Sequence, residues 1–325
     1  MNNPIRLQRA VAILSVLLFL IKIIAWYQTH AVSILTDALE SIVNVIAGFF
    51  GLYSLILSAK PKDSEHPYGH GKVEFISAAI EGTLILLAGL TIIWESVQQL
   101  WNPTPLHRVT DGMLLLGTTA LINAGLGWWA NKQGNKQKSL VLIASGKHLM
   151  ADALTTGGIL VGLGLIRFTG STWLDPVIAL GLAVWIIHTG YQIIRQSISG
   201  IIDEADHALI DQLILYINQH RKPNWIDLHN LRVIKYGSKL HLDAHLTLPW
   251  FFNMYEAHRE IDGLSELVQK HFGQSVELFI HTDGCLDFSC SVCDRLDCDK
   301  RQQAFVSKIP WTRENVSNDE KHRVG

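Results

Sequence analysis

The sequence predicts a membrane protein of two parts: an all-α domain of six transmembrane helices, then a small α+β domain outside the bilayer. Long apolar runs fill the first two hundred of the 325 residues, whereas the remainder is mixed and polar. A hydrocarbon core of about 30 Å needs roughly 20 apolar residues per helix, and six stretches reach that length. We therefore expect a transmembrane domain over 1–200, a second domain over 201–284 and a cysteine-rich tail over 285–325.

The six expected spans are separated by short polar segments. They lie near 8–29, 31–57, 73–101, 109–131, 140–167 and 173–197. The first begins with Arg6 and Arg9, as a cleaved signal peptide also would. However, Lys22 interrupts its apolar run and further spans follow, so we assign it as a membrane helix.

Basic residues are unevenly shared between the two sides of the expected membrane domain. Most lie on the side of the two chain ends, and the opposite side offers mainly Arg108 and Arg167. Because basic loops tend to stay in the cytoplasm, both termini are expected to be cytoplasmic. The formal net charge of −2 argues against a nucleic-acid partner, which would require a basic surface.

His148 and Asp152 stand four residues apart within the fifth span. Residues with this spacing share one face of a helix, so the imidazole and the carboxylate can converge on one cation. Ionisable groups are costly inside a bilayer and usually mark an ion pathway. The pair therefore predicts half of an intramembrane metal site.

The second span repeats this spacing with Glu40 and Asn44. Two facing helices would then supply four nitrogen and oxygen ligands, which suits a tetrahedral transition-metal ion. Two alternatives stay open. Asn44 and Ser41 are residues that packed membrane helices also use for hydrogen bonds to one another. In a second register, Asp37 rather than Asn44 completes the site with Glu40.

The segment between the second and third spans is short and rich in metal-ligand side chains. Asp63, His66 and His70 are spaced three and four apart around a proline and a glycine that can turn the chain. Three such ligands plus water predict an exposed metal site. The alternative is a solvated loop with incidental histidines, and spacing alone does not decide between them.

The soluble part is expected to form a helix over 205–220, strands over 226–236 and 239–248, a helix over 254–272 and a strand over 275–281. Alternating apolar and polar residues in the two middle strands, with Gly237 and Ser238 between them, predict a hairpin. The order αββαβ predicts one sheet with helices on one side.

Histidines recur through this domain and are followed by Asp283. They are His229, His241, His245, His258 and His281. Any one of them alone is more often a surface or hydrogen-bonded histidine than a ligand. Several brought together by one sheet would form a metal site.

Together these motifs resemble the cation diffusion facilitator family, and especially its bacterial zinc, cadmium and iron exporters that act as proton antiporters. The resemblance extends over about residues 8–284. It is carried by Tyr68-Gly-His-Gly-Lys72, by His148 with Asp152, and by Leu228-His-Asn-Leu-Arg232, His245, His258 and Ile280-His-Thr-Asp283.

The resemblance implies a homodimer of six-span protomers in the lipid bilayer, each with a metallochaperone-like cytoplasmic αββαβ domain. It also implies three metal sites and one charge pair between the domains. These are the transport site of Glu40, Asn44, His148 and Asp152; the loop site of Asp63, His66 and His70; the cytoplasmic site of His229, His245, His258, His281 and Asp283; and the pair Lys72 and Asp203.

The sequence departs from the family pattern in the second span, where the family usually has His or Asp followed by Asp. Here Glu40 and Asn44 occupy these places, and the neutral amide binds a divalent ion more weakly and exchanges no proton. Lys147 replaces an apolar neighbour of His148. Thr282 stands where some relatives carry an amide at the cytoplasmic cluster.

The expected function is efflux of a divalent cation such as Zn²⁺ or Fe²⁺, coupled to proton influx by alternating access, in a bacterial inner membrane. Moving two positive charges out against a negative-inside potential costs about 4.6 kcal/mol per 100 mV, so an inward ion must drive export. Ligands that lose protons when they bind metal couple the two flows. The alternative is a membrane-anchored metal sensor with an impaired transport site. An enzyme is not expected, because no pairing of nucleophile and base is found.

All four cysteines lie beyond the region of resemblance, at Cys285, Cys290, Cys293 and Cys298. A cytoplasmic location disfavours disulfides, so four thiols so close together predict a structural zinc ion. An iron–sulfur cluster is the alternative.

Overall fold

A computed structural model describes residues 4–29, 32–102, 109–169, 174–237, 239–273 and 276–323, with the side chains of some helical segments left out. The chain divides into two compact units, Met1–Ile202 and Asp203–Gly325. The predicted limits of the membrane domain, the second domain and the tail stay predictions.

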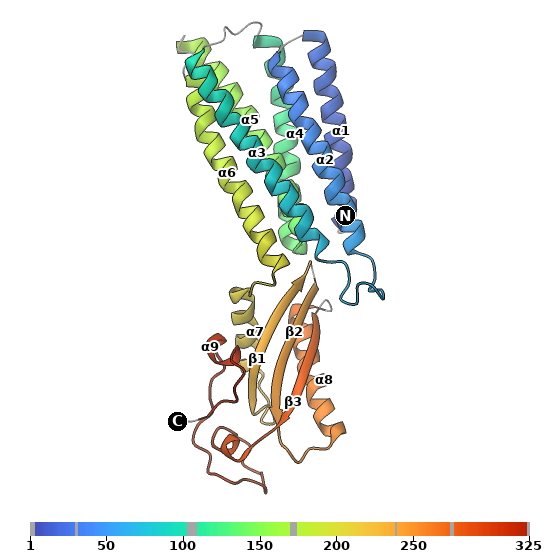
Figure 1. Cartoon of the computed structure of the whole chain (residues 1–325), viewed down its shortest axis with the longest axis vertical. Coiled ribbons are helices and arrows are strands. Elements are labelled where there is room, and N and C mark those ends of the chain that lie inside the picture. Colours follow the sequence, from blue (N-terminus) through green and yellow to red (C-terminus); the bar gives the residue numbers. More distant parts are fainter. Residues whose placement is uncertain are drawn as a thin grey trace. The chain divides into compact units, whose positions relative to one another are not determined.

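The first unit consists of long helices (Figure 1). Among the described residues they are α1 (Pro4–Thr29), α2 (Val32–Ser58), α3 (Val73–Trp101), α4 (Val109–Gln137), α5 (Leu140–Thr169) and α6 (Leu174–Ile201). Each covers all or nearly all of one expected apolar stretch. α4 and α6 extend past the predicted ends, because backbone hydrogen bonding continues into polar turns that a search for apolar runs does not include.

Two segments of the described residues are apolar and long enough to cross a bilayer, by length and composition. They are Ile5–Ile24 and Val73–Gln98. The number of six membrane spans therefore stays a prediction, although helices occupy all the expected positions.

Glycines allow the backbones of neighbouring helices in the first unit to pack in direct contact. A Cβ added to Gly82 on α3 would lie 3.1 Å from the carbonyl oxygen of Gly190 on α6. One added to Gly146 on α5 would lie 2.5 Å from the backbone nitrogen of Asn131 on α4. Small residues at such contacts are typical of packed membrane helices. The close α4–α5 contact positions the helix that carries His148.

Buried polar side chains connect the helices further. The Gln8 amide donates to Ser145 Oγ at 3.0 Å, and Ser145 in turn hydrogen bonds to the Glu81 side chain. Lys22 Nζ donates to Ser41 Oγ at 2.8 Å. Ser41 thus makes a hydrogen bond between two helices. This is the role that the sequence offered as an alternative to metal binding in the second span.

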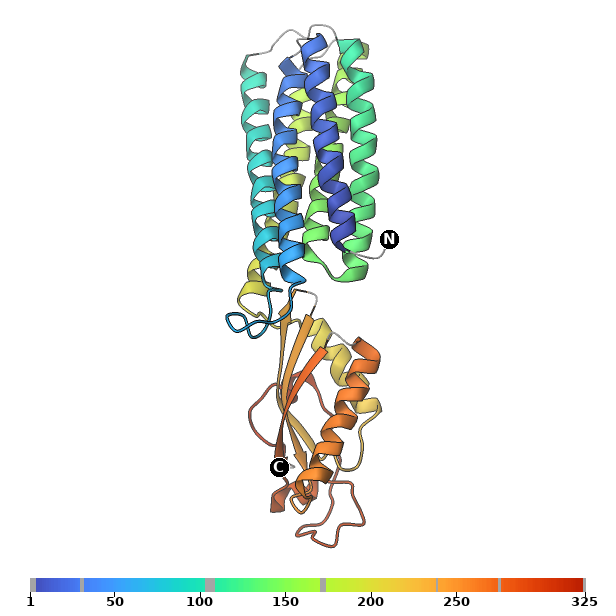
Figure 2. The ribbon, with the colours of Figure 1, turned by 90° about the vertical axis from the view of Figure 1, so that its right-hand side faces the viewer.

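The second unit contains a three-stranded sheet with two helices on one side (Figure 2). Its elements are α7 (His207–Gln219), β1 (Asp227–Tyr236), β2 (Lys239–Leu248), α8 (Met254–Phe272) and β3 (Val276–Gly284). The order αββαβ is the predicted one. β1 and β2 form the antiparallel hairpin, whereas β3 joins β2 in parallel, because α8 carries the chain back along the sheet.

The apolar core of this unit lies between the sheet and its helices. The helices contribute Ile210, Leu213, Ile214 and Ile217 from α7 and Leu264 and Val268 from α8. Trp311 and Val316, from the tail after β3, are buried in the same core. Arg221 also holds the tail, because its guanidinium donates to the Ile309 carbonyl at 2.8 Å and lies over the Trp311 ring. The tail, which includes η1 (Asp287–Ser291) and α9 (Arg313–Val316), is therefore packed onto the second unit.

Candidate metal sites

Asn44 connects α2 to α5 at the predicted transport site. Its Nδ2 donates a hydrogen bond to Asp152 Oδ2, and its Oδ1 accepts one from His148 Nε2. Asn44 and His148 are 7% and 5% exposed, so this contact lies inside the first unit. Three of the four predicted ligands therefore meet. The side chains of Glu40 and Asp37 lie outside the described residues.

His148 has a second ring nitrogen available for another partner. In the described part of the chain its buried Nδ1 has no hydrogen-bond partner. A buried polar atom without a partner costs about 1–3 kcal/mol. A ligand that reached this nitrogen would remove that cost.

The loop between α2 and α3 brings its three predicted ligands together. Asp63 Oδ1 lies 3.1 Å from His66 Nδ1, and Asp63 Oδ2 lies 3.4 Å from His70 Nε2. One atom from each of Asp63, His66 and His70 lies within 4.8 Å of the others. The turn that produces this arrangement includes Gly69, whose φ of 92° suits glycine and few other residues.

Backbone hydrogen bonds hold the Asp63 carboxylate in this loop. The His66 N–H donates to Asp63 Oδ1 at 2.7 Å and the Glu65 N–H donates to the same oxygen at 3.1 Å. The His66 backbone hydrogen bond lowers the pKa of Asp63; burial opposes this, but the hydrogen bond of the His66 imidazole and the charges of both imidazoles add to the lowering. The carboxylate is therefore charged at neutral pH and suited to a cation.

Three histidines of the second unit form one row across the sheet. The strand register places His229 on β1 opposite His245 on β2, and His245 opposite His281 on β3. Neighbouring strands are about 4.8 Å apart, so paired residues bring their imidazoles close together. The ring centroids are 5.1 Å apart for His229 and His245, and 4.7 Å apart for His245 and His281.

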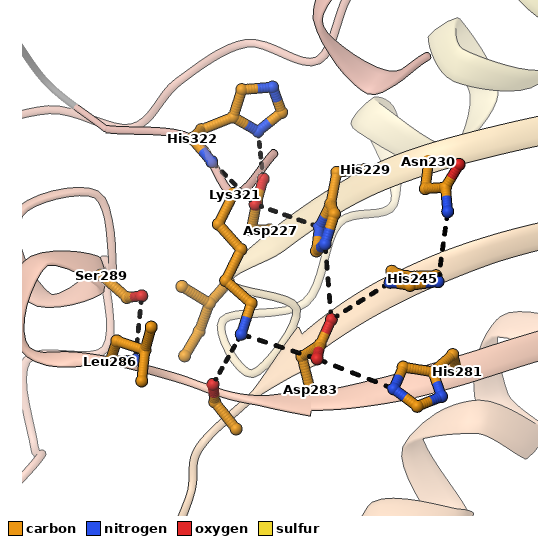
Figure 3. A network of polar contacts seen from close by, with 12 residues as sticks. Asp227, His229, Asn230, His245, His281, Asp283, Leu286, Ser289, Lys321 and His322 are labelled. Carbon is orange, nitrogen blue, oxygen red and sulfur yellow. Dashed lines mark hydrogen bonds and ion pairs between the residues drawn. The ribbon is translucent and has the colours of Figure 1, made fainter. Parts of the chain in front are cut away.

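Asp283, two residues after His281, joins this row with its carboxylate (Figure 3). Its Oδ2 lies 3.4 Å from His229 Nε2 and 3.4 Å from His245 Nδ1. These three atoms are within 4.8 Å of one another. His281 Nε2 lies 3.8 Å from the other oxygen, Oδ1. We call His229, His245, His281 and Asp283 the histidine row.

His258 and His241 lie apart from the histidine row. His258 is on α8, where its Nε2 is 3.7 Å from Asp262 Oδ2 and its side chain is 69% exposed. His241 is buried on β2 beside Glu277, 3.3 Å from a carboxylate oxygen. The grouping of His258 with the row, which the resemblance implied, stays a prediction.

Asp227 supports the histidine row, and the sequence analysis missed it. Its Oδ2 lies 3.4 Å from His229 Nδ1, the nitrogen that faces away from Asp283. Burial would raise the pKa of Asp227, but hydrogen bonds from His229 and His322 outweigh it and hold that pKa well below its usual range. Asp227 and His229 are two residues apart on β1 and therefore lie on the same face of the sheet. This spacing could have predicted that the carboxylate lies beside the imidazole.

Two residues from the end of the tail, Lys321 and His322, complete this network. His322 donates its backbone N–H to Asp227 Oδ2 at 3.0 Å, and its Nδ1 also contacts Asp227. Lys321 Nζ lies 3.6 Å from Asp283 Oδ1 and donates to the Gly284 carbonyl at 3.1 Å. No periodicity in the tail sequence indicates these contacts.

The four cysteines Cys285, Cys290, Cys293 and Cys298 line one pocket and are all free thiols. Backbone N–H groups of Trp250 and Gln302 each lie 3.4 Å from a sulfur, those of Cys285 and Cys290. Among the described residues, the sulfurs do not converge within 4.8 Å as the loop and row ligands do. Burial raises the pKa of Cys285 and Cys293, so both remain thiols unless a cation is present.

The predicted charge pair falls on residues of different units. Lys72 Nζ donates to the carbonyl of Ile201 at 3.3 Å within the first unit. Asp203 begins the second unit with a φ of 58°. Their pairing stays a prediction.

Comparison with known proteins places two family models on the chain in succession. The cation efflux transmembrane domain matches residues 9–202. The cytoplasmic domain of cation efflux proteins matches residues 205–285. The cysteine tail lies almost wholly beyond both matches.

Three curated relatives match most of the chain. An uncharacterized transporter of Synechocystis, sll1263, is 34% identical and covers 78% of this chain and 83% of its own. The cation-efflux pump FieF of Pectobacterium atrosepticum is 28% identical, with 83% and 89% covered. Metal tolerance protein C1 of Arabidopsis thaliana is 30% identical, with 91% and 66% covered.

Proposed function

We propose, since this chain belongs to the cation diffusion facilitator family of membrane transporters, that it exports a divalent metal ion in exchange for protons. Membership of this family supports divalent cation efflux. The exchange of the cation for protons is the part that we propose. The observation that carries it is the meeting of Asn44, His148 and Asp152 inside the first unit.

The proposed transport site contains His148 and Asp152 from α5 and Asn44 with Glu40 from α2. The Asn44 amide bridges the imidazole and the carboxylate. An entering cation would replace these two hydrogen bonds with bonds to nitrogen and oxygen atoms, which suit Zn²⁺ and related ions. Asp37 is the alternative partner of Glu40.

Proton coupling needs groups that exchange a proton when metal binds or leaves, and Asn44 has none. His148 and Asp152 must be deprotonated to bind metal. Glu81 on α3 offers a further acid: it is 3% exposed, and its Oε2 has no partner among the described residues. Ser145, to which Glu81 hydrogen bonds, lies one helical turn before His148. We therefore include Glu81 in the proton route.

The proposed topology is a homodimer of six-span protomers with both termini in the cytoplasm of a bacterial cell. The match to a cytoplasmic domain after residue 204 supports a cytoplasmic second unit. The histidine row would then bind cytosolic metal, with Zn²⁺ as the preferred ion, and the loop site would bind metal near the membrane surface. Lys72 and Asp203 would join the two domains.

The cysteine tail is proposed to hold a structural zinc ion, with an iron–sulfur cluster as the alternative. The single pocket lined by all four thiols and the N–H groups directed at two sulfurs support a bound metal. Anaerobic purification followed by absorbance and elemental analysis tests this proposal. Colourless protein with one extra zinc supports it, whereas brown protein containing iron contradicts it.

The transport proposal is tested with purified protein in liposomes that carry a pH gradient. Zn²⁺, Fe²⁺, Mn²⁺, Co²⁺ and Cd²⁺ are offered one at a time, and metal flux is measured. His148→Ala and Asp152→Ala should abolish flux, whereas His188→Ala, which removes an exposed histidine of α6 that bonds Gln192, should not. Flux that survives both of the first two changes would refute the site.

A membrane-anchored metal sensor is the second candidate, because Asn44 and Lys147 weaken the transport site while the histidine row is intact. The same liposomes separate the two functions. A sensor would bind metal at the row yet show no flux with any ion of the panel. A transporter shows flux that depends on the pH gradient.

A further inference from the structure

The last described residues of the tail place a positive charge on the carboxylate of the histidine row. Lys321 Nζ is 3.6 Å from Asp283 Oδ1, and the lysine side chain is only 19% exposed (Figure 3). Asp283 is also the carboxylate that both His229 and His245 approach. The ammonium group and a metal ion therefore require the same charged partner.

The backbone holds Lys321 in this position, which distinguishes it from a surface lysine with a freely moving side chain. The neighbouring His322 is bonded to Asp227 through its backbone N–H and its ring. Three residues before Lys321, the Asn318 carbonyl accepts a hydrogen bond of 2.7 Å from the Asn230 N–H on β1. Trp311 and Val316 anchor the preceding segment in the core.

The same two tail residues act on both nitrogens of His229. Lys321 contacts the Asp283 carboxylate, which faces His229 Nε2. His322 holds Asp227, which faces His229 Nδ1. A carboxylate on the far nitrogen of a metal-binding histidine fixes its tautomer and makes it a better ligand. His322 thus prepares the histidine for metal, while Lys321 places a positive charge beside the other oxygen of Asp283, Oδ1.

We propose that Lys321 is a built-in competitor of the metal ion at the histidine row, so that a divalent cation binds only by displacing the ammonium group and releasing the end of the tail. This inference rests on the proposed binding of metal by the row. Repulsion between the ammonium group and a divalent ion a few ångströms away makes joint occupancy of Asp283 unfavourable. The affinity of the row is therefore lower than its ligands alone would give, and a rise in metal concentration changes the position of the tail.

The test measures Zn²⁺ binding by the full-length protein in detergent, in competition with a chromogenic chelator. All variants carry His148→Ala and His66→Ala, so that the transport and loop sites do not contribute. Zn²⁺ held by the cysteine tail is measured in the same background with His229→Ala and subtracted. Lys321→Met should bind Zn²⁺ roughly three- to tenfold more tightly, because it removes the competing charge. Lys321→Arg should bind like the parent. The matched control is Lys308→Met, which breaks another ion pair of the tail, to Asp294.

Hydrogen exchange of residues 318–323 provides a second readout. Zn²⁺ should speed exchange there in the parent protein, because metal releases the tail, whereas in Lys321→Gln the segment should respond much less. Tighter binding in Lys308→Met as well, or no effect of Lys321→Met on affinity, would overturn the proposal. If His229→Ala binds as much Zn²⁺ as the parent, the row is not a metal site and the proposed function of the row fails instead.

Discussion

His148 on α5 donates a hydrogen bond to the side chain of Asn44 on α2, and the same amide donates to Asp152. An amide, which does not ionise, therefore joins the two ionisable candidates of the transport site. This contact keeps the two helices in register without a carboxylate at position 44. His148 and Asp152 therefore both contact position 44, although an amide stands there in place of the acid that the resemblance leads us to expect.

Replacing this amide by an acid should strengthen the transport site. Asn44→Asp adds a negative charge next to the cation, worth more than about 1.4 kcal/mol in a buried site, so metal should bind about tenfold more tightly. The added carboxylate also exchanges a proton, so flux should depend more steeply on the pH gradient. Flux assays in liposomes at several external pH values measure both effects. An unchanged pH dependence would show that position 44 takes no part in coupling.

Glu81→Gln should uncouple metal movement from the pH gradient. The change keeps the shape of the side chain and its hydrogen bond to Ser145 but removes the exchangeable proton. We expect proton-driven flux to fall at least about tenfold, equivalent to a barrier higher by about 1.4 kcal/mol, while metal binding is retained.

Glu74→Gln is the matched control for that change. Glu74 is also a buried acid of α3, but its two oxygens accept hydrogen bonds from Ser58 at 2.9 Å and Ser139 at 3.1 Å. The role of Glu74 is therefore structural. Metal flux in the Glu74→Gln variant should still respond to a pH gradient. Equal losses in both variants would argue against a specific proton route through Glu81.

Within the histidine row, His245→Ala should weaken metal binding more than any other single histidine change. His245 lies between His229 and His281 and shares the Asp283 carboxylate with His229. Loss of this ligand should reduce Zn²⁺ affinity about 10- to 100-fold, the range seen when groups that support a metal are removed. His258→Ala should change the affinity of the row less than about twofold. A chelator competition assay measures both affinities. If His258→Ala weakened Zn²⁺ binding more than His245→Ala, His258 would have to be a ligand of the row.

Asp206 should make the stability of α7 depend on pH. It caps this helix, accepting a hydrogen bond from the Leu209 N–H at 3.0 Å, and it pairs with Lys235. Burial would raise the pKa of Asp206, but the Lys235 hydrogen bond and the backbone N–H groups lower it overall. The stabilisation is therefore complete above the unfolded pKa of about 3.9 and is lost as pH falls through the lower folded pKa.

Two variants separate the cap of α7 from its charge. Asp206→Ala should cost about 1 kcal/mol at neutral pH, whereas Asp206→Asn keeps the cap and should lose mainly the pH dependence. Hydrogen exchange of 207–219 in the full-length protein, corrected for intrinsic rates, measures both. Identical exchange in the alanine variant and the parent at neutral pH would contradict the cap.

The sequence predicted most accurately those elements whose ends are marked by nearby turn or capping residues. Lys239–Leu248 and Met254–Phe272 have the predicted bounds, because Gly237 turns the hairpin and Asn253 forms a capping box with Glu256. The parallel pairing of β3 with β2 was not predicted, because it depends on the path of a whole crossover helix.

The candidate sites divide in the same way. Asp63, His66 and His70 lie within one loop, so their spacing nearly determines their geometry. The place of His258 in the row stays a prediction, because a position on α8 gives no distance to the sheet. Lys321 and His322 could not have been found, since they contact Asp283 and Asp227 across long stretches of chain that carry no repeating pattern.

β3 ends in Asp283 and Gly284, and the next residue, Cys285, donates its N–H to the Leu248 carbonyl at 2.8 Å, which extends the ladder with β2. One strand end thus carries both a hard oxygen donor and a soft sulfur donor, two residues apart on the same hydrogen-bonded ladder. Hydrogen peroxide that joins the Cys285 thiol to a second tail thiol, taking up their two protons and two electrons to form water, should therefore alter how the neighbouring carboxylate is presented. Protein from oxidised and from reduced cells would then answer the same zinc concentration differently.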